Sequence, residues 1–277
     1  MRLHWAISVP KLFLTRVSLF PMKVISYNVN GIRSAMSKGL VDYLADQNAD
    51  IVCFQELKAL PEQIDEEHFK ALGYQCYWFS AQKKGYSGVG ILTKQTPMAV
   101  EYGCGNDLYD FEGRVIRCDF SWGSVMSVYF PSGTSGDERQ DVKMNFLDFF
   151  YDYAKKTRVR VGELAVCGDY NICHRAIDIH DPVGNKNSTG FLPEERAWMD
   201  QWFEAGFTDT LRTLHPEPHQ YTWWSFRANA RANNKGWRID YVSVSSQLAG
   251  QLSASGIDDF AKHSDHCPTW ADFRIIC

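Results

Sequence analysis

Apolar runs that end in polar side chains recur along the chain. Residues 164–167 form an unbroken apolar run that stops at Gly168, and Asp169 and Asn171 follow at once. Such a run without polar alternation is typical of a strand covered on both faces. Similar arrangements occur at residues 24–30, 50–56, 237–241 and 264–268. If these segments share one core, their polar ends converge on one cleft and build an oxygen-rich metal site with one histidine.

Helical periodicity separates these predicted strands. Residues 39–48 carry Leu40, Val41 and Leu44 at helical spacing, and residues 137–156 have the pattern of a long amphipathic helix. Prolines favour two further helices, which begin at residues 61 and 193. Additional strands are expected at residues 74–79, 89–93, 114–120, 124–130, 222–226, 239–244 and 269–275. Strands and helices follow one another in a similar order in both halves of the chain. This order predicts an α/β fold in which two sheets pack face to face with helices outside.

Composition indicates one domain. The chain has 277 residues, of which 45% are hydrophobic and 14% aromatic, so it can bury a large core. No Pro/Gly/Ser-rich linker divides it, and we expect a single domain over residues 22–277. Residues 1–21 form an N-terminal extension that is too short and too charged for a membrane span. They either lie outside the fold or serve as a targeting segment, although no small-residue cleavage site is evident.

Charge and cysteine content narrow the class of protein. A net charge of -4 argues against a wholly basic nucleic-acid coat but allows a local basic face. None of the eight cysteines forms a C-x-x-C pair, and several lie in apolar runs, as buried free thiols do. This pattern indicates a reducing compartment without a zinc cluster. We therefore expect a cytoplasmic protein, with no membrane contact, that acts as a monomer.

Glu56 is the first candidate metal ligand. By itself, a glutamate after a buried strand more simply caps a helix or pairs with Lys58. Together with Asn28, Asn30 and Asp265, however, it forms a plausible seat for Mg²⁺, which prefers a few carboxylates and retained waters. No sulfur or multi-histidine cluster favours zinc instead. The predicted cofactor is therefore Mg²⁺, with Mn²⁺ as a possible substitute.

The other polar strand ends suggest hydrolysis of a phosphate ester. Asp169 and Asn171 can stabilise a turn or cap a helix, or else Asp169 deprotonates an attacking water while Asn171 donates to a phosphoryl oxygen. His266 is a candidate cation, held by Asp240, that offsets charge on the phosphorus. Tyr129 offers a phenolic donor or merely packs at the edge of a sheet.

Six motifs in order give the chain a family resemblance. They are Ser-Tyr-Asn-Val-Asn-Gly-Ile-Arg (26–33), Phe-Gln-Glu-Leu-Lys (54–58), Tyr-Phe-Pro-Ser-Gly (129–133), Gly-Asp-Tyr-Asn-Ile (168–172), Gly-Trp-Arg-Ile-Asp-Tyr (236–241) and Ser-Asp-His-Cys-Pro (264–268). In this order they resemble the exonuclease III family of DNA-repair nucleases. The resemblance spans residues 22–275, which is almost everything except the extension.

The resemblance implies a fold and a chemistry. The fold is a four-layer α/β sandwich, in which two packed mixed sheets are flanked by helices. The chemistry is Mg²⁺-dependent hydrolysis of double-stranded DNA at 3′ ends or abasic sites, which leaves 3′-hydroxyl groups. Abasic-site endonuclease, 3′→5′ exonuclease and 3′-phosphatase activities share this chemistry. The implied catalytic residues are Asp169, His266, Asp240, Tyr129, Asn171 and Asn28, and the implied metal ligands are Glu56, Asn30 and Asp265.

The resemblance also implies DNA contacts. Substrate-binding positions fall on Lys58, Asn185, Trp223, Trp237, Ile239 and Arg196. Trp223 stands where the family often has phenylalanine, so its indole would narrow the pocket for a flipped sugar. Neutralisation of the DNA backbone falls on Lys83, Lys84, Arg227, Arg231, Lys235 and Arg238, although solvated surface charge is the simpler explanation for any one of them.

Two other functions stay open from the sequence. A phosphatase or phosphodiesterase that acts on a non-DNA ester would share Gly-Asp-x-Asn and Ser-Asp-His. The strings at residues 236–241 and 191–196 resemble the DNA-repair branch instead. A non-catalytic DNA-binding module is disfavoured because every expected catalytic position carries a competent residue.

Overall fold

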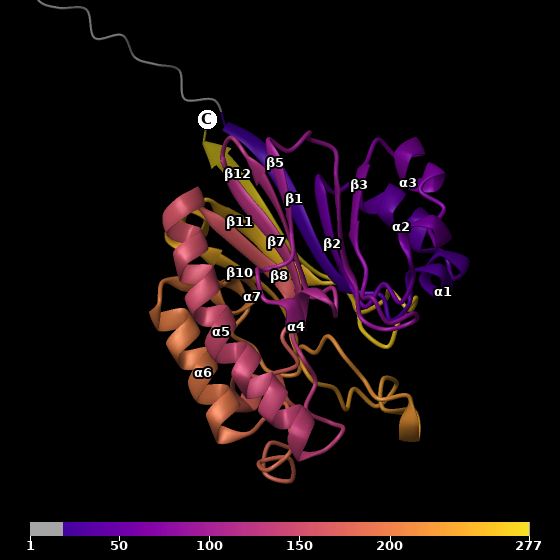
Figure 1. The fold of residues 1–277 in the computed structure, drawn as a ribbon. Helices are drawn as coiled ribbons and strands as arrows, with labels where there is room; N and C mark the ends of the chain where they lie inside the picture. The colour runs from indigo at the N-terminus through magenta and orange to yellow at the C-terminus, as the bar shows by residue number, and fades with distance from the viewer. Residues whose placement is uncertain (1–18, 277) are drawn as a thin grey trace, which may run out of the picture.

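Two six-stranded mixed sheets form the centre of the molecule. The computed structural model describes residues 19–276, and the two sheets pack face to face around a shared apolar layer (Figure 1). The first sheet has the order β11-β12-β1-β2-β4-β3 and consists of β1 (Leu19–Asn28), β2 (Ile51–Gln55), β3 (Gln75–Phe79), β4 (Val89–Thr93), β11 (Leu252–Ile257) and β12 (Thr269–Ile276). The second has the order β5-β6-β7-β8-β10-β9 and consists of β5 (Ala99–Tyr102), β6 (Val115–Phe120), β7 (Gly123–Tyr129), β8 (Leu164–Asp169), β9 (Phe207–Asp209) and β10 (Asp240–Ser245).

Helices cover the outer faces of both sheets. On the first sheet these are α1 (Ile32–Ser37), α2 (Leu40–Gln47) and α3 (Glu67–Ala71), and on the second they are α5 (Asp137–Val161) and α6 (Pro193–Glu204). The shorter helices are α4 (Asp107–Asp110), α7 (Thr210–Leu214), α8 (Ser246–Gly250), η1 (Pro61–Gln63), η2 (Ala176–Asp178) and η3 (Arg227–Asn229). The four-layer α/β sandwich predicted from the sequence is confirmed.

Burial on both faces explains the unbroken apolar runs. In β1, Ile25 and Tyr27 pack against the helices, whereas Val24 packs between the two sheets. In β8, likewise, Val166 packs against the helices and Ala165 packs against the other sheet. Since alternate side chains of a strand point to opposite faces, both sets of positions must be apolar.

Each sheet contains one parallel pair of strands. β1 lies parallel to β2 with Asn28 opposite Gln55, and β7 lies parallel to β8 with Tyr129 opposite Asp169. The antiparallel strand β10 begins with Asp240, directly opposite Asp169. The polar ends of these strands therefore meet at one edge of the sandwich, at the lower end of the sheets in Figure 1.

Gly168 allows this close approach of β7 and β8. A Cβ atom at this position would lie 2.2 Å from the Val128 carbonyl oxygen of the neighbouring strand. Real Cβ atoms do not approach a backbone oxygen so closely, so a larger residue would push β8 away from β7. The glycine that ends the apolar run thus fixes the position of Asp169.

The structure corrects two predicted elements. Residues 222–226 do not form a strand, because Trp223 makes only isolated bridges with Trp237 and His266. The helix predicted from residue 61 is instead the single turn η1 followed by α3. Ile64 between them has extended backbone angles, which break the helical hydrogen bonds. The sequence pattern also missed α1, α4, α7, α8, β5 and β9, which are short, and β11, which consists mostly of small and polar residues.

The start of the fold lies slightly before residue 22. β1 begins at Leu19, which pairs with Ile276 of β12. Three residues of the predicted extension therefore belong to a strand, and its first 18 residues lie outside the described part of the chain. Within residues 19–276, no helix is long and apolar enough to cross a membrane. The seven cysteines in this range are free thiols.

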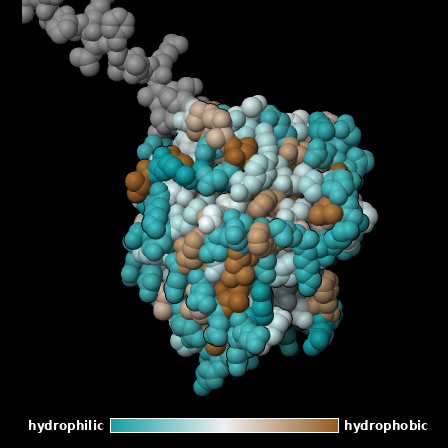
Figure 2. Space-filling model, in the orientation of Figure 1, coloured by the Kyte–Doolittle hydropathy of each residue, from teal (hydrophilic) through white to brown (hydrophobic). Residues whose placement is uncertain are grey.

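The surface in Figure 2 is mostly hydrophilic, with hydrophobic side chains below the middle of this face, where α4 lies in Figure 1. Tyr102 of β5, Leu108 of α4 and the adjacent Phe111 are each about half exposed, at 51%, 55% and 50%. Scattered exposed apolar side chains are normal on folded proteins. The apolar content of the sequence is otherwise concentrated in the two helix-covered layers and between the sheets.

Candidate active site

The buried amide of Asn28 joins carboxylates from the two sheets. Asn28, at the end of β1, donates from Nδ2 to Glu56 Oε1 and to Asp169 Oδ2, both at 2.8 Å. Its Oδ1 accepts the backbone N–H of Asn30 at 3.0 Å, which fixes the orientation of the amide. Glu56 follows β2 of the first sheet and Asp169 ends β8 of the second. Asn28 therefore sets the spacing between carboxylates that come from different halves of the chain.

A histidine completes this cluster. The ligand atoms of Glu56, Asp169 and His266 all lie within 4.8 Å of one another. His266 Nδ1 contacts Asp240 Oδ2 at 2.9 Å, while its Nε2 lies 3.9 Å from Asp169 Oδ2. Because Asp240 engages Nδ1, the other ring nitrogen is directed toward the cleft. This is the orientation predicted for the His266–Asp240 pair.

Burial shifts the protonation of the cluster. Burial, reinforced by the negative charge of Asp240, raises the pKa of Asp169 to about 8, although His266 partly opposes this shift. Burial alone would lower the pKa of His266, but the charge and hydrogen bond of Asp240 outweigh it and raise the value to about 10. Both groups therefore hold a proton more tightly than usual when no cation is bound beside them.

A second group of polar side chains surrounds Glu56. Lys58 Nζ lies 2.6 Å from Glu56 Oε2 and donates to Asn30 Oδ1 at 2.5 Å. Asn30 in turn donates from Nδ2 to Asp265 Oδ1 at 2.8 Å. Burial would raise the pKa of Glu56, yet Lys58 and the Asn28 amide lower it. The oxygens of Glu56, Asn30 and Asp265 thus form a corner of the cleft that stabilises positive charge.

The donor atoms of this corner fit a hard divalent cation. Glu56, Asp169 and Asp265 offer carboxylate oxygens, and Asn30 offers an amide oxygen, which are the ligand types that Mg²⁺ and similar ions prefer. The cluster contains no sulfur ligand, because none of the described cysteines lines the cleft. A metal site is therefore consistent with the geometry.

Tyr129 and Asn171 extend the cluster along the second sheet. The Tyr129 ring lies 5.1 Å from the Arg114 guanidinium, and burial and the charges of Glu56 and Asp169 raise the pKa of its phenol well above the usual value. The backbone N–H of Asn171 donates to Asp169 Oδ1 at 2.8 Å. Its side-chain Nδ2 donates to the Phe130 carbonyl at 3.0 Å and lies 3.4 Å from Asp169 Oδ2.

Four residues at this site have left-handed backbone. Asn30, Glu56, Lys58 and Asn171 have φ angles of 45°, 54°, 49° and 54°, a region that residues other than glycine rarely adopt. Such conformations cost free energy and persist only where the surroundings enforce them, and they cluster at functional sites. Sequence patterns did not reveal this feature, because no glycine marks these positions.

The cluster lies in a cleft of about 470 Å³. Nine of its lining residues are among those predicted for the site, namely Glu56, Tyr129, Asp169, Asn171, Trp223, Trp237, Ile239, Asp265 and His266. Five others were missed, namely Ser132, Thr134, Ser188, Thr189 and Gly190. The missed residues are small and lie in loops, where neither periodicity nor unusual chemistry distinguishes them.

Two tryptophans form one wall of the cleft. The rings of Trp223 and Trp237 meet edge to face, with centroids 6.1 Å apart. Trp223 Nε1 donates to Asp265 Oδ2 at 3.0 Å, a contact that phenylalanine could not make. Burial would raise the pKa of Asp265, but the charge of His266 and the hydrogen bonds from Asn30 and Trp223 lower it. The indole thus lines the cleft and also fixes a predicted metal ligand.

Other predicted substrate contacts lie outside the cleft lining. Asn185 donates from its side chain to the carbonyls of His180 and Asp181, both at 3.0 Å. These hydrogen bonds stabilise the loop over residues 180–185. The Arg196 guanidinium stacks 4.6 Å from the Phe191 ring. The roles of both side chains in substrate binding stay predictions, as does that of Lys58.

The prediction that Arg238 contacts DNA is wrong. Its side chain is fully buried, and its Nε and Nη2 donate to Asp178 and Asp209 at 2.7 and 2.8 Å. Arg231 is also largely engaged, because it donates to three backbone carbonyls, those of Asp259, Ala261 and Ser264. The basic character of a residue does not reveal whether it faces solvent. Lys83, Lys84, Arg227 and Lys235 are exposed, as the prediction requires.

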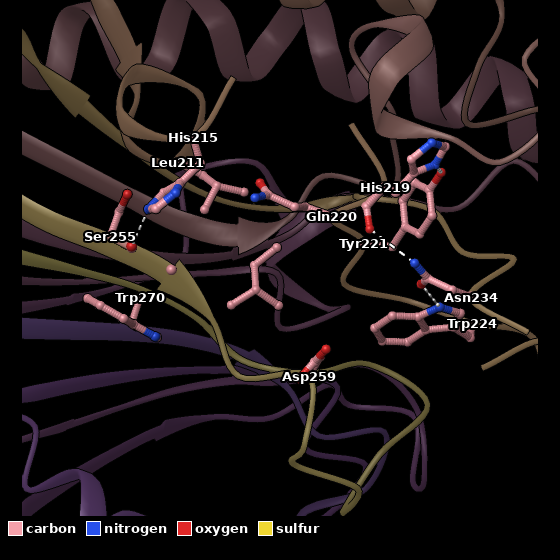
Figure 3. A pocket seen from close by; sticks show the side chains of 12 residues that line it. Leu211, His215, His219, Gln220, Tyr221, Trp224, Asn234, Ser255, Asp259 and Trp270 are labelled. Atoms are coloured by element: carbon pink, nitrogen blue, oxygen red, sulfur yellow. Dashed lines mark hydrogen bonds between the residues drawn. The ribbon is translucent and has the colours of Figure 1, made fainter. Parts of the chain in front are cut away.

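A second cavity, of about 380 Å³, lies between β11 and the loop around residues 215–224 (Figure 3). Its polar groups are largely paired with one another. His215 Nε2 contacts the Ser255 carbonyl at 2.8 Å, and Asn234 bonds both the His219 carbonyl and Trp224 Nε1. Among residues 19–276, the close group of carboxylates and histidine that could hold a metal lies in the cleft and not in this cavity, so the cleft is the candidate active site.

Known proteins resemble this chain over most of its length. Residues 25–266 match the Endonuclease/Exonuclease/phosphatase family. The chain is 41% identical over 249 residues to an exodeoxyribonuclease of Bacillus subtilis, with 89% of this chain and 97% of the relative covered. It is 39% identical over 250 residues to the DNA repair nuclease APEX1 of Danio rerio, with 89% and 80% covered.

The fold agrees with a solved structure of similar sequence. The 3′ phosphatase NExo from Neisseria, bound to a product DNA hairpin, superimposes with a TM-score of 0.85 at 29% identity, with 91% of this chain and 99% of that chain covered. The resemblance indicated by the six sequence motifs is confirmed. The chain therefore belongs to the Endonuclease/Exonuclease/phosphatase family.

Proposed function

We propose that this enzyme is a DNA-repair nuclease that hydrolyses phosphodiesters of double-stranded DNA and leaves 3′-hydroxyl ends. It acts as a 3′→5′ exonuclease, as an abasic-site endonuclease or as both, with 3′-phosphatase activity as a further use of the same site. The main support is the cluster in which the Asn28 amide joins Glu56 to Asp169 beside His266. The names of its relatives, an exodeoxyribonuclease and a DNA repair nuclease, support DNA as the substrate.

The metal that best suits the cluster is Mg²⁺, for which Mn²⁺ would substitute. Glu56 would be its principal ligand, with Asn30 and Asp265 nearby, because these side chains supply hard oxygen donors and lie next to one another. A bound divalent ion would offset negative charge on the phosphoryl oxygens of the substrate. Lys58, which contacts both Glu56 and Asn30, is the proposed substrate-binding residue beside this site.

Asp169 is the proposed base. Burial and the charge of Asp240 raise the pKa of Asp169, which makes its carboxylate a stronger acceptor for the proton of an attacking water. The water oxygen attacks phosphorus, its proton passes to Asp169, and the bond from phosphorus to the 3′ oxygen breaks. That oxygen takes up a proton from solvent and remains as a 3′-hydroxyl.

Three other groups stabilise the charge that develops on the phosphoryl oxygens. Asn171 Nδ2 has one firm hydrogen bond, to the Phe130 carbonyl, and a weaker one to Asp169, so one N–H is available to the phosphate. His266, protonated and held by Asp240, supplies a buried positive charge. Tyr129 keeps its phenolic proton and donates it in a hydrogen bond.

Substrate recognition is proposed for the aromatic wall and for exposed basic residues. Trp223, Trp237 and Ile239 would contact the sugar at the reacting phosphate, and Lys83, Lys84, Arg227 and Lys235 would neutralise the DNA backbone. Asn185 and Arg196 would support the loop that faces the DNA. A monomeric state and a cytoplasmic location remain predictions from the sequence.

A comparison of substrates tests this function. The purified protein in Mg²⁺ is incubated with a duplex that carries a central abasic analogue, a duplex with a recessed 3′ end, and a nicked duplex with a 3′-phosphate. We expect hydrolysis of at least one, with a 3′-hydroxyl product that a polymerase can extend. Hydrolysis of a small phosphate ester without action on any of the three duplexes would favour the non-DNA alternative. Binding without hydrolysis would favour a DNA-binding module.

A further inference from the structure

A buried lysine lies behind the cleft, on the inner face of α5. Lys143 belongs to the same face of the helix as Phe146, Leu147 and Phe150, which form an apolar core. Its side chain is 1% exposed, and that of its partner Glu195 is 0% exposed. A buried ion pair contributes little net stability compared with apolar side chains of similar size. Stability alone therefore does not account for this pair, and its contacts point to a role in the cleft.

Lys143 contacts the backbone of a proposed catalytic residue. Its Nζ donates to the Asn171 carbonyl at 2.8 Å and to Glu195 Oε1 at 2.5 Å. Asn171 is in the left-handed region with a φ of 54°, which would be unfavourable without such a partner. On its other side, Asn171 binds Asp169 and the Phe130 carbonyl. Lys143 thus fixes the peptide of Asn171 from the side opposite to the cleft.

Glu195 holds residues 188–190, a loop that forms part of the wall of the cleft. Its Oε2 accepts the backbone N–H groups of Gly190 and Leu192 at 2.7 and 2.9 Å. Its Oε1 also accepts from Gln140 Nε2 at 3.1 Å and lies 3.4 Å from Thr189 Oγ1. Because Ser188, Thr189 and Gly190 line the cleft, this carboxylate determines the position of the wall.

The wall and Asn171 are packed against each other. Gly190 has a φ of +92°, and a Cβ atom there would lie 3.1 Å from the Asn171 carbonyl oxygen and 2.9 Å from Cζ3 of Trp237. The Gly190 carbonyl also accepts the N–H of Cys173 at 2.7 Å. With so little space, neither segment can shift without the other, and both are attached to the same ion pair.

We propose that Lys143 and Glu195 are positioning residues for phosphodiester hydrolysis. Lys143 holds Asn171 so that its side-chain N–H meets the phosphoryl oxygen, and Glu195 holds residues 188–190 in place in the adjoining wall of the cleft. This inference rests on the proposed function. Neither side chain touches the substrate, and both act through the groups that they hold.

The test uses Lys143→Met, the double variant Lys143→Met/Glu195→Gln, and Arg117→Met as a matched control. Arg117 is also a buried cation, paired with Glu101 and Asp119, but it lies away from the cleft. For each protein, kcat and KM are measured on the preferred duplex, DNA affinity is measured in EDTA, and Tm is measured by thermal unfolding.

Lys143→Met should lower kcat about 10²-fold, as small displacements of positioned groups do, with little change in DNA affinity. Its Tm should fall because Glu195 is left without its partner. The double variant should regain most of the lost Tm, since a glutamine side chain at position 195 is neutral and its oxygen still accepts the two backbone N–H groups. The kcat of the double variant should nevertheless stay low. Arg117→Met should lose Tm and keep kcat.

Recovery of kcat together with Tm in the double variant would overturn this inference alone, because the pair would then act only on stability. A folded Lys143→Met enzyme with the wild-type kcat would do the same. If Lys143→Met does not fold, the double variant decides the question. Absence of DNA hydrolysis by the wild type would instead overturn the proposed function and, with it, this inference.

Discussion

The cleft and the second cavity have similar volumes, about 470 and 380 Å³. They differ in how their ionisable and polar side chains are paired. In the cleft, Glu56, Asp169 and His266 crowd together with perturbed pKa values, and Asp240 Oδ1 is buried without a hydrogen-bond partner. In the second cavity, groups such as His215 and Asn234 are paired within the protein. Concentrated, poorly compensated charge distinguishes a reactive site from a void, whereas size does not.

The two cavities also differ in their place in the fold. The cleft lies at the ends of both parallel strand pairs, so both sheets supply its residues. The second cavity lies beside β11, at the edge of the first sheet, and its lining comes from β11, Trp270 of β12, Leu211 of α7 and the neighbouring loops. Rigid strands hold reactive groups in place more accurately than loops do. Four experiments test whether the residues of the cleft carry the activity and those of the second cavity do not.

Removal of divalent cations should have the largest effect. EDTA should abolish hydrolysis of DNA. Without a cation, the negative carboxylates of the cleft would repel the negative phosphate of the substrate. Mg²⁺ should restore the activity, and Mn²⁺ should restore at least part of it. The assay is cleavage of a labelled duplex before and after addition of each ion. Full activity in EDTA would contradict the metal assignment.

Asp169→Asn should lower kcat by about 10²–10⁴-fold, the usual contribution of a positioned acid or base. The amide has a similar shape, so affinity for uncleaved DNA should change little. Single-turnover cleavage and a binding assay in EDTA separate the two quantities. A variant that cleaves as fast as the wild type would remove Asp169 from the mechanism.

The cleft should also make stability depend on pH in the absence of cations. Asp169 and His266 have raised pKa values of about 8 and 10, so the folded protein keeps protons that the unfolded chain releases. The stabilisation from Asp169 is complete below its usual pKa of 3.8 and is lost as pH rises toward 8. That from His266 is complete below 6.5 and is lost as pH rises toward 10.

Urea unfolding in EDTA at pH 5, 7 and 9 measures this dependence. The free energy of unfolding should fall as pH rises, and Asp169→Asn should make the fall smaller. His215→Ala, in the second cavity, should keep the slope of the wild type. Equal slopes in the wild type and Asp169→Asn would show that Asp169 does not carry the raised pKa.

The smallest effect is expected in the second cavity itself. His215→Ala removes the hydrogen bond from Nε2 to the Ser255 carbonyl, which should lower the free energy of unfolding by about 1 kcal/mol. The kcat and KM on DNA should stay at the wild-type values, because no lining residue of the cleft is changed. A marked loss of activity in this variant would mean that the two cavities are coupled.

Several elements and site residues followed from local patterns. The unbroken apolar runs identified the central strands, and the polar residues after them marked Glu56, Asp169 and Asp240 as candidates. Other predictions failed where the surroundings of a residue depend on partners that are distant in the sequence. Arg238 is a strong cation in the sequence, yet Asp178 and Asp209, which neutralise it, lie 60 and 29 residues away. Residues 222–226 have strand-like composition, but only Trp223 finds a bridging partner.

The sequence by itself determined the central strands, the covering helices α2, α5 and α6, and the polar residues that stand at the ends of those strands. These properties depend on side-chain periodicity and on glycine and proline positions, which act over a few residues. Only the tertiary structure decided that Asn28 meets Asp169 across 141 residues, that Lys143 lies behind Asn171, and that residues 188–190 face the cleft. Such contacts depend on how two sheets pack, and packing is set by many side chains at once.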